Sequence, residues 1–148
     1  MVVQSKNKNS FIKNTLKELN KQVKEEKRAE PRYKVVFVIN IDLRMSNGKV
    51  ISQCMHAYDE LLEKTRSTPF LAQTYALWKA EGAAKITLKG TRSKMSQIAE
   101  AASKTGINHS EVIDGGRTEV KSGSMTVVAV GPGLCEDIDR VTGGLPIY

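Results

Sequence analysis

The sequence predicts an α/β domain in which helices pack against a small, mixed sheet. Runs of β-branched residues alternate with segments of helical periodicity from Tyr33 onward, which is the pattern of a layered α/β domain. A turn around Gly123 separates the last two predicted strands, so we expect these two strands to form an antiparallel pair.

Four strands and four helices are predicted in this region. The run Val35–Ile39 is apolar and β-branched, and it indicates a buried first strand at about 34–41. The remaining strands are expected at about 84–89, 108–113 and 125–130. Helical spacing of apolar residues predicts helices at about 49–65, 69–81 and 93–104, and a short one after Gly131–Gly133 to about 141. We expect the stripe Phe70, Leu71, Tyr75, Leu77 and Trp78 to belong to the core.

The first 32 residues are predicted to be a leader, and residues 33–148 a separate domain. Residues 1–10 are expected to be disordered. Ser10 is a plausible N-cap for an amphipathic helix at 11–30, which Pro31 would close. The apolar residues of that helix are Ile12, Leu16, Leu19 and Val23.

Positive charge is concentrated in this leader. The chain of 148 residues has a net charge of +7. Residues 1–34 carry ten Lys/Arg against four Asp/Glu, whereas the rest of the chain carries 13 against 12. A basic arm favours polyanions, and nucleic acid is the polyanion that we expect; a solubilising tail is the alternative.

Several classes of protein are not indicated. No apolar run approaches the roughly 18 residues of a membrane span, and the N-terminus lacks an apolar signal segment. Two cysteines are too few for a disulfide framework, so we expect reduced thiols and a cytoplasmic location. Cys54 and His56 would lie about 200° apart on a helix, which argues against a shared metal ion. We expect neither a metal nor a cofactor.

Loops after the strands carry the candidate binding residues. Ligand sites of open α/β sheets form at the carboxyl ends of strands, which places loops 42–49 and 90–93 at one edge, with 131–133 as an additional candidate. These loops present Arg44, Lys49, Arg92 and Lys94. The first loop also opens a helix, where unpaired N–H groups and the helix dipole favour an anion. The alternative is a connecting loop with a solvated lysine.

The segment Asp114-Gly-Gly-Arg-Thr118 is a second candidate. Two glycines beside an acid, an arginine and a hydroxyl allow the backbone to approach a ligand closely. The alternative is a simple turn with Arg117 in a surface salt bridge.

Together, the two segments resemble the archaeal/eukaryotic-type peptidyl-tRNA hydrolase family. The family pattern reads Met-Gly-Lys-Gly-Lys, then Gln-Cys-x-His-Ala, then Asp-Ala-Gly-Arg-Thr-Gln. The corresponding segments here are Met45–Ala57 and Asp114–Thr118. The resemblance covers about residues 34–148 and extends to Trp78, Gly82, Lys85, Val127–Pro132 and the ending Val141–Tyr148.

The resemblance implies a three-layer α/β/α domain with a four-stranded mixed sheet, usually a homodimer. It implies hydrolysis of the ester that joins a peptide to the 3′ ribose of tRNA, without a cofactor or membrane. Its working residues would be Lys49, Gln53, His56, Asp114 and Thr118. The predicted tRNA-binding residues are Arg44, Asn47, Gly48, Lys85, Lys89, Arg92, Lys94 and Arg117.

We expect Asp114 to accept a proton from water or orient that water, with Thr118 as its hydrogen-bond partner. Lys49 would stabilise the oxyanion or hold the terminal phosphate, and Gln53 would position the ester. His56 is expected to be structural, because it lies two turns further along the helix. This site requires the start of the 49–65 helix and residues 114–118 to share a cleft.

Four positions depart from the family pattern: Asn47, Gly115, Glu119 and Gly144 replace lysine, alanine, glutamine and histidine. Asn47 and Glu119 together shift the local charge by two units, which would weaken attraction for phosphate. A non-catalytic RNA- or protein-binding member of the same fold is therefore the alternative function. A scaffold that acts through its charged leader helix is a third.

Overall fold

The computed structural model describes residues 3–26 and 32–148, with side chains at 10–25 and 32–148. Contacts within the chain divide it between residues 30 and 31, close to the expected boundary. The two parts are therefore treated separately.

The N-terminal part is one helix, α1 (Val3–Glu26). The expectation of disorder is wrong for residues 3–10, and Ser10 lies inside the helix rather than at its cap. The segment has neither Gly nor Pro, so nothing in it interrupts helical backbone hydrogen bonding. Residues 1–2 and the expected helix end near Pro31 lie outside the described residues.

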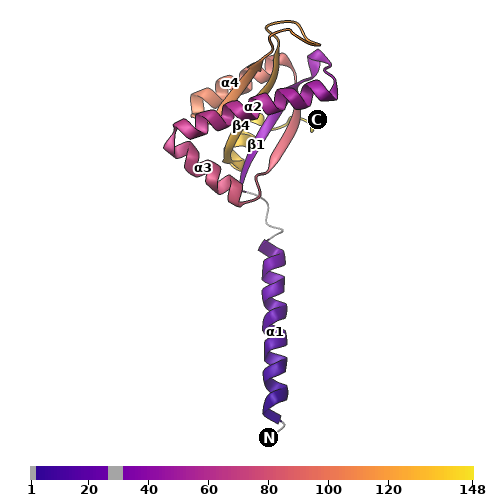
Figure 1. Cartoon of the computed structure of the whole chain (residues 1–148). Helices are drawn as coiled ribbons and strands as arrows, with labels where there is room; N and C mark the ends of the chain where they lie inside the picture. The colour runs from indigo at the N-terminus through magenta and orange to yellow at the C-terminus, as the bar shows by residue number, and fades with distance from the viewer. Residues whose placement is uncertain (1–2, 27–31) are drawn as a thin grey trace. The chain divides into compact units, whose positions relative to one another are not determined.

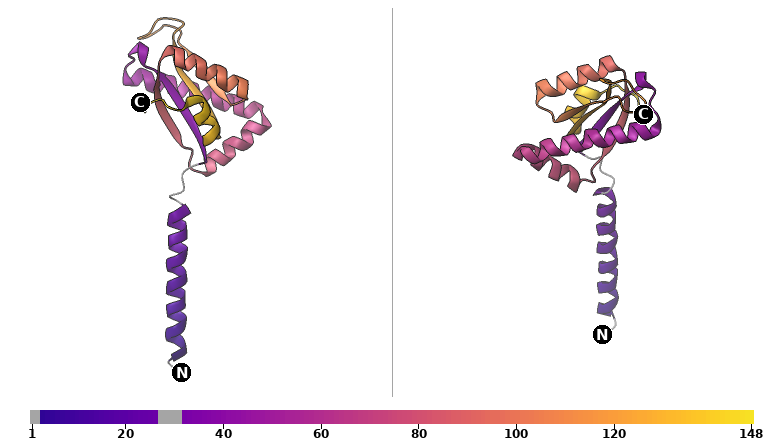
Figure 2. Two further views of the ribbon diagram at one scale, coloured as in Figure 1. Left: turned by 180° about the vertical axis from the view of Figure 1, so that it is seen from behind. Right: turned by 45° about the horizontal axis from the view of Figure 1, so that its top comes forward.

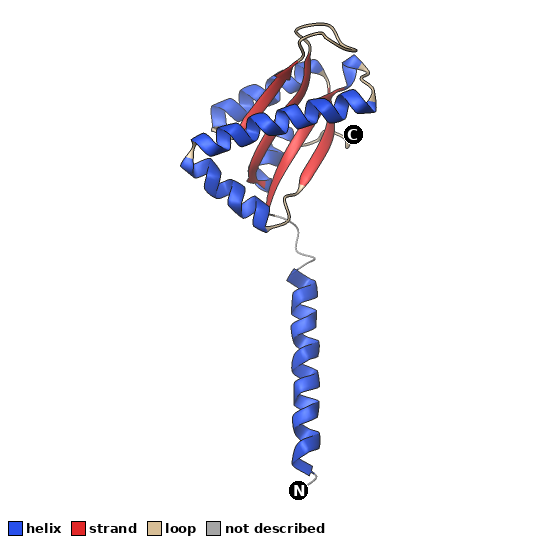
Figure 3. Ribbon diagram, viewed as in Figure 1, coloured by secondary structure: helices blue, strands red, loops and turns tan. Residues whose placement is uncertain are grey.

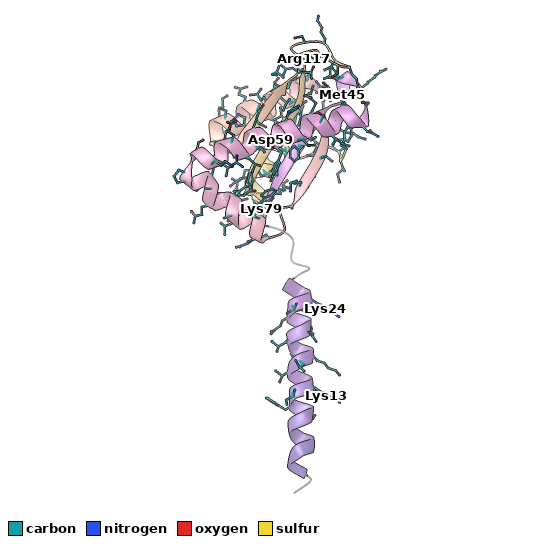
Figure 4. The ribbon with its side chains drawn as sticks, viewed as in Figure 1. Lys13, Lys24, Met45, Asp59, Lys79 and Arg117 are labelled. Carbon is teal, nitrogen blue, oxygen red and sulfur yellow. The ribbon has the colours of Figure 1, made fainter. Side chains whose placement is uncertain are left out.

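Two stripes run along α1. The apolar residues Ile12, Leu16, Leu19 and Val23 are 47–53% exposed. A second stripe contains lysines at spacings of four, four and three residues, which places them on one helix face: Lys13, Lys17, Lys21 and Lys24. Figure 4 labels the first and last of these lysines.

The second part contains the predicted mixed sheet of four strands, in the order β2-β1-β4-β3 (Figure 3). Its strands are β1 (Tyr33–Asn40), β2 (Lys85–Gly90), β3 (His109–Ile113) and β4 (Met125–Leu134). β1 and β2 are parallel, whereas β4 is antiparallel to both of its neighbours.

Helices cover both faces of this sheet, as predicted. On one face lie α2 (Asn47–Ser67) and α3 (Pro69–Ala80), seen in front of the sheet in Figure 1. On the other lie α4 (Arg92–Thr105) and α5 (Cys135–Thr142), nearer the viewer in the left panel of Figure 2. Side chains of β1 alternate between the two faces, so that strand is buried on both sides.

The expected aromatic core is only partly right. Trp78 is fully buried, and its indole N–H donates a hydrogen bond to the Ala84 carbonyl at 2.9 Å. Tyr75 packs against Trp78 with ring centroids 5.5 Å apart. Phe70, however, is 71% exposed, and Leu77 is also exposed, so neither residue belongs to the core.

The carboxyl ends of β1 and β2 are tied together at one end of the sheet. Buried Asn40 closes β1, and its amide nitrogen donates to the Met125 carbonyl at 2.8 Å. The Asp42 carboxylate, in the short 3₁₀ helix Ile41–Leu43, accepts the backbone N–H of Arg92 at 2.9 Å. The starts of α2 and α4 are therefore held at this end.

The segment Gly131–Gly133 does not lie at the same end of the sheet as the starts of α2 and α4. The expectation that it forms a loop at that edge is therefore wrong. This segment belongs to β4, and Gly133 pairs with Lys34 at the beginning of β1. Because β4 is antiparallel to β1, its carboxyl end lies at the opposite end of the sheet.

The last residues of the chain cover part of the outer edge of β2. The Lys89 N–H donates to the Pro146 carbonyl at 2.8 Å, and the Tyr148 N–H donates to the Thr87 carbonyl at 3.0 Å. Residues 146–148 therefore add a short antiparallel segment beside β2.

Candidate active site

Lys49 is placed by the first turn of α2. Ser46 caps this helix, and its hydroxyl oxygen accepts the Lys49 backbone N–H at 3.3 Å. The Lys49 side chain is largely buried and extends toward the loop after β3. Its ammonium lies 2.5 Å from a carboxylate oxygen of Asp114 and 2.5 Å from the Thr118 hydroxyl.

Asp114 is the first residue after β3 and is fixed by the backbone of its own loop. Its N–H and carbonyl bond to Ser124 and Gly123, both at 2.9 Å. Its second carboxylate oxygen accepts the Gly116 N–H at 2.7 Å. Gly116 has a φ of +77°, and a Cβ there would lie 2.7 Å from Ser122, so this position requires glycine.

These contacts keep Asp114 ionised. The hydrogen bond from the Lys49 ammonium holds the pKa of the Asp114 carboxyl below its ordinary value, and the Gly116 N–H and the charges of Lys49 and His56 act in the same direction. At neutral pH the cluster is therefore a carboxylate–ammonium pair with a hydroxyl beside it.

Glu119 joins the same loop to the start of α2. One carboxylate oxygen accepts the Ser46 N–H at 2.8 Å, and the other accepts the Ser46 hydroxyl. These bonds lower the pKa of the Glu119 carboxyl. The negative charge is thus held at a helix N-terminus by two hydrogen bonds, which is a favourable location for it.

A pocket of about 620 Å³ opens over the cluster. Lys49, Gln53 and His56 line it from one face of α2, because their spacing of four and three residues places them in one row. Buried Gln53 accepts the Thr126 hydroxyl at 2.6 Å through its amide oxygen. His56 is exposed at this pocket rather than packed in the core, so the expectation that it is structural is not supported by its burial.

The start of α2 and the loop 114–119 therefore share one cleft, at the end of the sheet where Figure 4 labels Met45 and Arg117. A family model described as peptidyl-tRNA hydrolase PTH2 matches residues 33–148. The chain belongs to this family.

Individual members of the PTH2 family are similar over the same region. A protein of Haloquadratum walsbyi named peptidyl-tRNA hydrolase is 38% identical over 116 residues, which are 78% of this chain and 99% of that protein. Mouse peptidyl-tRNA hydrolase 2, mitochondrial, is 37% identical over 78% of this chain and 64% of its own length. A probable peptidyl-tRNA hydrolase 2 of Dictyostelium discoideum is 38% identical, over 78% and 54% respectively.

Two of the predicted tRNA-binding residues, Lys85 and Asn47, do not line the cleft. The Lys85 ammonium lies 4.6 Å from the ring centroid of Trp78 and donates to the Ala83 carbonyl at 3.1 Å. Lys85 begins β2 and therefore lies at the other end of that strand from Gly90. Lys85 and Asn47 both line a different groove, next to β2.

The other predicted tRNA-binding residues lie near the cleft. Gly48 and Arg117 line the pocket itself. Four basic residues lie at the same end of the sheet but do not line the pocket: Arg44, Lys89, Arg92 and Lys94.

Sequence reasoning missed three residues that support the site. Ser46 has a recognisable signal, since a serine before a helical pattern is a typical N-cap. Gly116 was expected to allow close approach to a ligand or to form a turn, and not to bind the Asp114 carboxylate. Thr126 has no signal, because it reaches Gln53 from 73 residues away.

Over the described side chains, no group of three or more His, Cys, Asp or Glu could hold a metal ion. Among the described helices, none is both long enough and apolar enough to cross a membrane.

Proposed function

We propose that this PTH2 family member hydrolyses the ester between a peptide and the 3′ ribose of tRNA, and so recycles prematurely released peptidyl-tRNA. The observation that carries the proposal is the Lys49–Asp114–Thr118 cluster in an open pocket at the start of α2. Hydrolysis of an activated ester needs an oriented water and a donor for the developing oxyanion, and this cluster offers both.

The geometry suggests a division of roles. The ionised Asp114 carboxylate and the Thr118 hydroxyl would hold the attacking water. The Lys49 ammonium would stabilise negative charge on the carbonyl oxygen, since it is already fixed between Asp114 and Thr118. A carboxylate with a lowered pKa is a weak proton acceptor, which favours orientation of the water over full proton abstraction by Asp114.

Basic residues around the pocket would hold the tRNA. Arg44, Arg92 and Arg117 are exposed at the same end of the sheet as the cluster. Guanidinium groups there would bind phosphates without reading bases, and the lysine stripe of α1 would add further phosphate contacts.

A peptide-release assay tests the proposal directly. Lys49→Met and Asp114→Asn should each lower turnover by about 10²-fold, because each removes one charged group from the reacting centre. Lys104→Met and Asp59→Asn are matched controls, since both residues are exposed and lie outside the pocket. Wild-type turnover in the Lys49 and Asp114 variants would overturn these assignments. Binding of tRNA without peptide release by the unaltered protein would identify a non-catalytic binding member.

We also propose a homodimer and a cytoplasmic location, on the basis of family resemblance and composition. The four acidic residues of the leader are atypical of a mitochondrial targeting sequence, although the mouse relative is named mitochondrial. Light scattering on the purified protein measures its mass, and fractionation of cells locates the native chain. A monomer, or recovery in the organelle fraction, would contradict the respective proposal.

A further inference from the structure

A second hollow lies beside α2, on the opposite flank from the catalytic pocket. We name it the apolar groove; it has a volume of about 600 Å³. Ile51, Met55 and Tyr58 line it from α2, and Thr87 of β2 and Tyr148 form its other side. Ile51 and Met55 are 61% and 63% exposed, so two large apolar side chains of one helix row remain open to a ligand.

The groove has almost no charge to offer. Lys85 is its single basic lining residue, and the Lys85 ammonium is already held by the Trp78 ring and the Ala83 carbonyl. Burial raises the pKa of the Cys54 thiol to about 11. Burial and a hydrogen bond with Tyr75 raise the pKa of Tyr58 to about 12, so both groups are neutral at physiological pH. The groove therefore suits an uncharged, apolar ligand and not a phosphate.

Neighbouring residues of the first turn of α2 line the two hollows. Asn47 lines the apolar groove, whereas the next two residues, Gly48 and Lys49, line the catalytic pocket. Gly48 is exposed, and a Cβ on it would meet no atom within 4 Å. Gly48 itself therefore places no side chain between the groove and the catalytic lysine.

We infer that the apolar groove binds the peptide part of the substrate, with a preference for apolar residues near the ester. The inference rests on the proposed function. The two parts of the substrate that the ester joins differ in chemistry: the tRNA is a polyanion, whereas the peptide is an uncharged chain. The basic residues at the end of the sheet fit the tRNA, and the apolar groove fits the peptide.

The length of the groove is consistent with a short extended peptide. From Asn47 to Tyr58 the helix rises about 16 Å, at roughly 1.5 Å per residue. An extended chain covers about 3.3–3.6 Å per residue, so about four or five peptide residues could lie along α2.

Substrate selectivity tests the inference. The double variant Ile51→Thr/Met55→Gln removes apolar surface but adds no charge that could repel tRNA. The two substrates to compare are N-acetyl-leucyl-leucyl-tRNA and N-acetyl-glycyl-glycyl-tRNA. For the variant, kcat/KM should fall about tenfold with the leucyl substrate and change less than twofold with the glycyl one. Phe70→Gln, an equally exposed apolar position on α3 outside the groove, is the control and should alter neither.

Binding of the peptide alone gives an independent readout. N-acetyl-leucyl-leucine amide, titrated into the isotope-labelled full-length chain, should shift the amide NMR signals of residues 51–58 in the wild type and not in the double variant. An equal loss of kcat/KM with both substrates, or an unchanged ratio of the two kcat/KM values, would overturn the inference. A lower molecular mass of the variant with unchanged selectivity would assign the groove to a second copy instead. If the wild type hydrolyses neither substrate, the proposed function fails, and the peptide titration alone then decides whether the groove binds peptide.

Discussion

Glu119 uses both carboxylate oxygens to fix Ser46, the residue that caps α2. Glu119→Ala should lower kcat about tenfold, because the loop that carries Thr118 would no longer be fastened beside Lys49. Glu119→Gln should keep most of the activity, since its amide oxygen can still accept the Ser46 N–H. Steady-state kinetics measure both effects, and Glu111→Ala, an exposed acid on β3, is the control. Wild-type kcat in Glu119→Ala would contradict this role.

The Asp114–Lys49 pair should make stability depend on pH in the acid range. The pKa of Asp114 is lower in the folded state than its ordinary value of 3.8. The pair therefore stabilises the fold fully above that ordinary value, and this contribution is lost as the pH falls through the lowered folded pKa. Urea unfolding at decreasing pH from pH 6 measures the free energy of unfolding of the wild type and of Asp114→Asn. The difference between these two free energies should become smaller as the pH falls. A gap that stays constant down to pH 2 would contradict the expectation.

At the level of single residues, local motifs predicted the charged centre but not the contacts that support it. Lys49 and Asp114 each stand beside glycines in short sequence patterns, which single them out. The partner of Gln53 could not be predicted, because Thr126 of β4 meets it only through the packing of α2 against the sheet. The position of Lys85 outside the cleft could not be predicted either, because its contact with Trp78 depends on how the chain folds back between α3 and β2.

Two helix caps offer a comparison at the level of elements. Ser46 and Thr91 cap α2 and α4 in the same way, each accepting a backbone N–H at 3.3 Å. Ser46→Ala and Thr91→Ala should each lower the free energy of unfolding by about 1 kcal/mol. Only Ser46→Ala should also slow hydrolysis, because only Ser46 binds Glu119 and precedes Lys49. Chemical denaturation and peptide release measure the two effects; equal activity losses in both variants would contradict the distinction.

Element types were predicted well, whereas the end of β4 was not. Periodicity identifies each strand and helix of the 33–148 region, because one face of each is buried. Gly131–Gly133 suggested a turn, yet β4 continues through it beside β1. Gly131 has a φ of +111°, and a Cβ there would lie 2.6 Å from the Lys34 carbonyl oxygen. Glycine thus allows a close approach of the two strands, at an irregularity of pairing that sequence alone does not reveal.

For the molecule as a whole, charge should govern substrate affinity. Binding of peptidyl-tRNA should weaken steeply with salt, and deleting residues 1–30 should make the dependence shallower. Replacing the lysines of α1 at positions 13, 17, 21 and 24 by glutamine should have the same effect without shortening the chain. For every phosphate that the variant no longer neutralises, the slope of log K against log salt should become shallower by about 0.7–0.9. Filter binding between 50 and 300 mM salt measures the slope. An affinity that does not change with salt concentration would contradict a role for the leader.

The segment that covers β2 has a consequence for colloidal behaviour. A bare strand at the rim of a sheet offers its N–H and C=O groups to any neighbouring molecule, and this is a common start of aggregation. Residues 146–148 already occupy the Thr87 and Lys89 positions of that rim. A protein shortened by these residues would thus expose the edge of β2 to strand pairing between molecules. By covering this edge, the segment protects the protein from precipitation on storage.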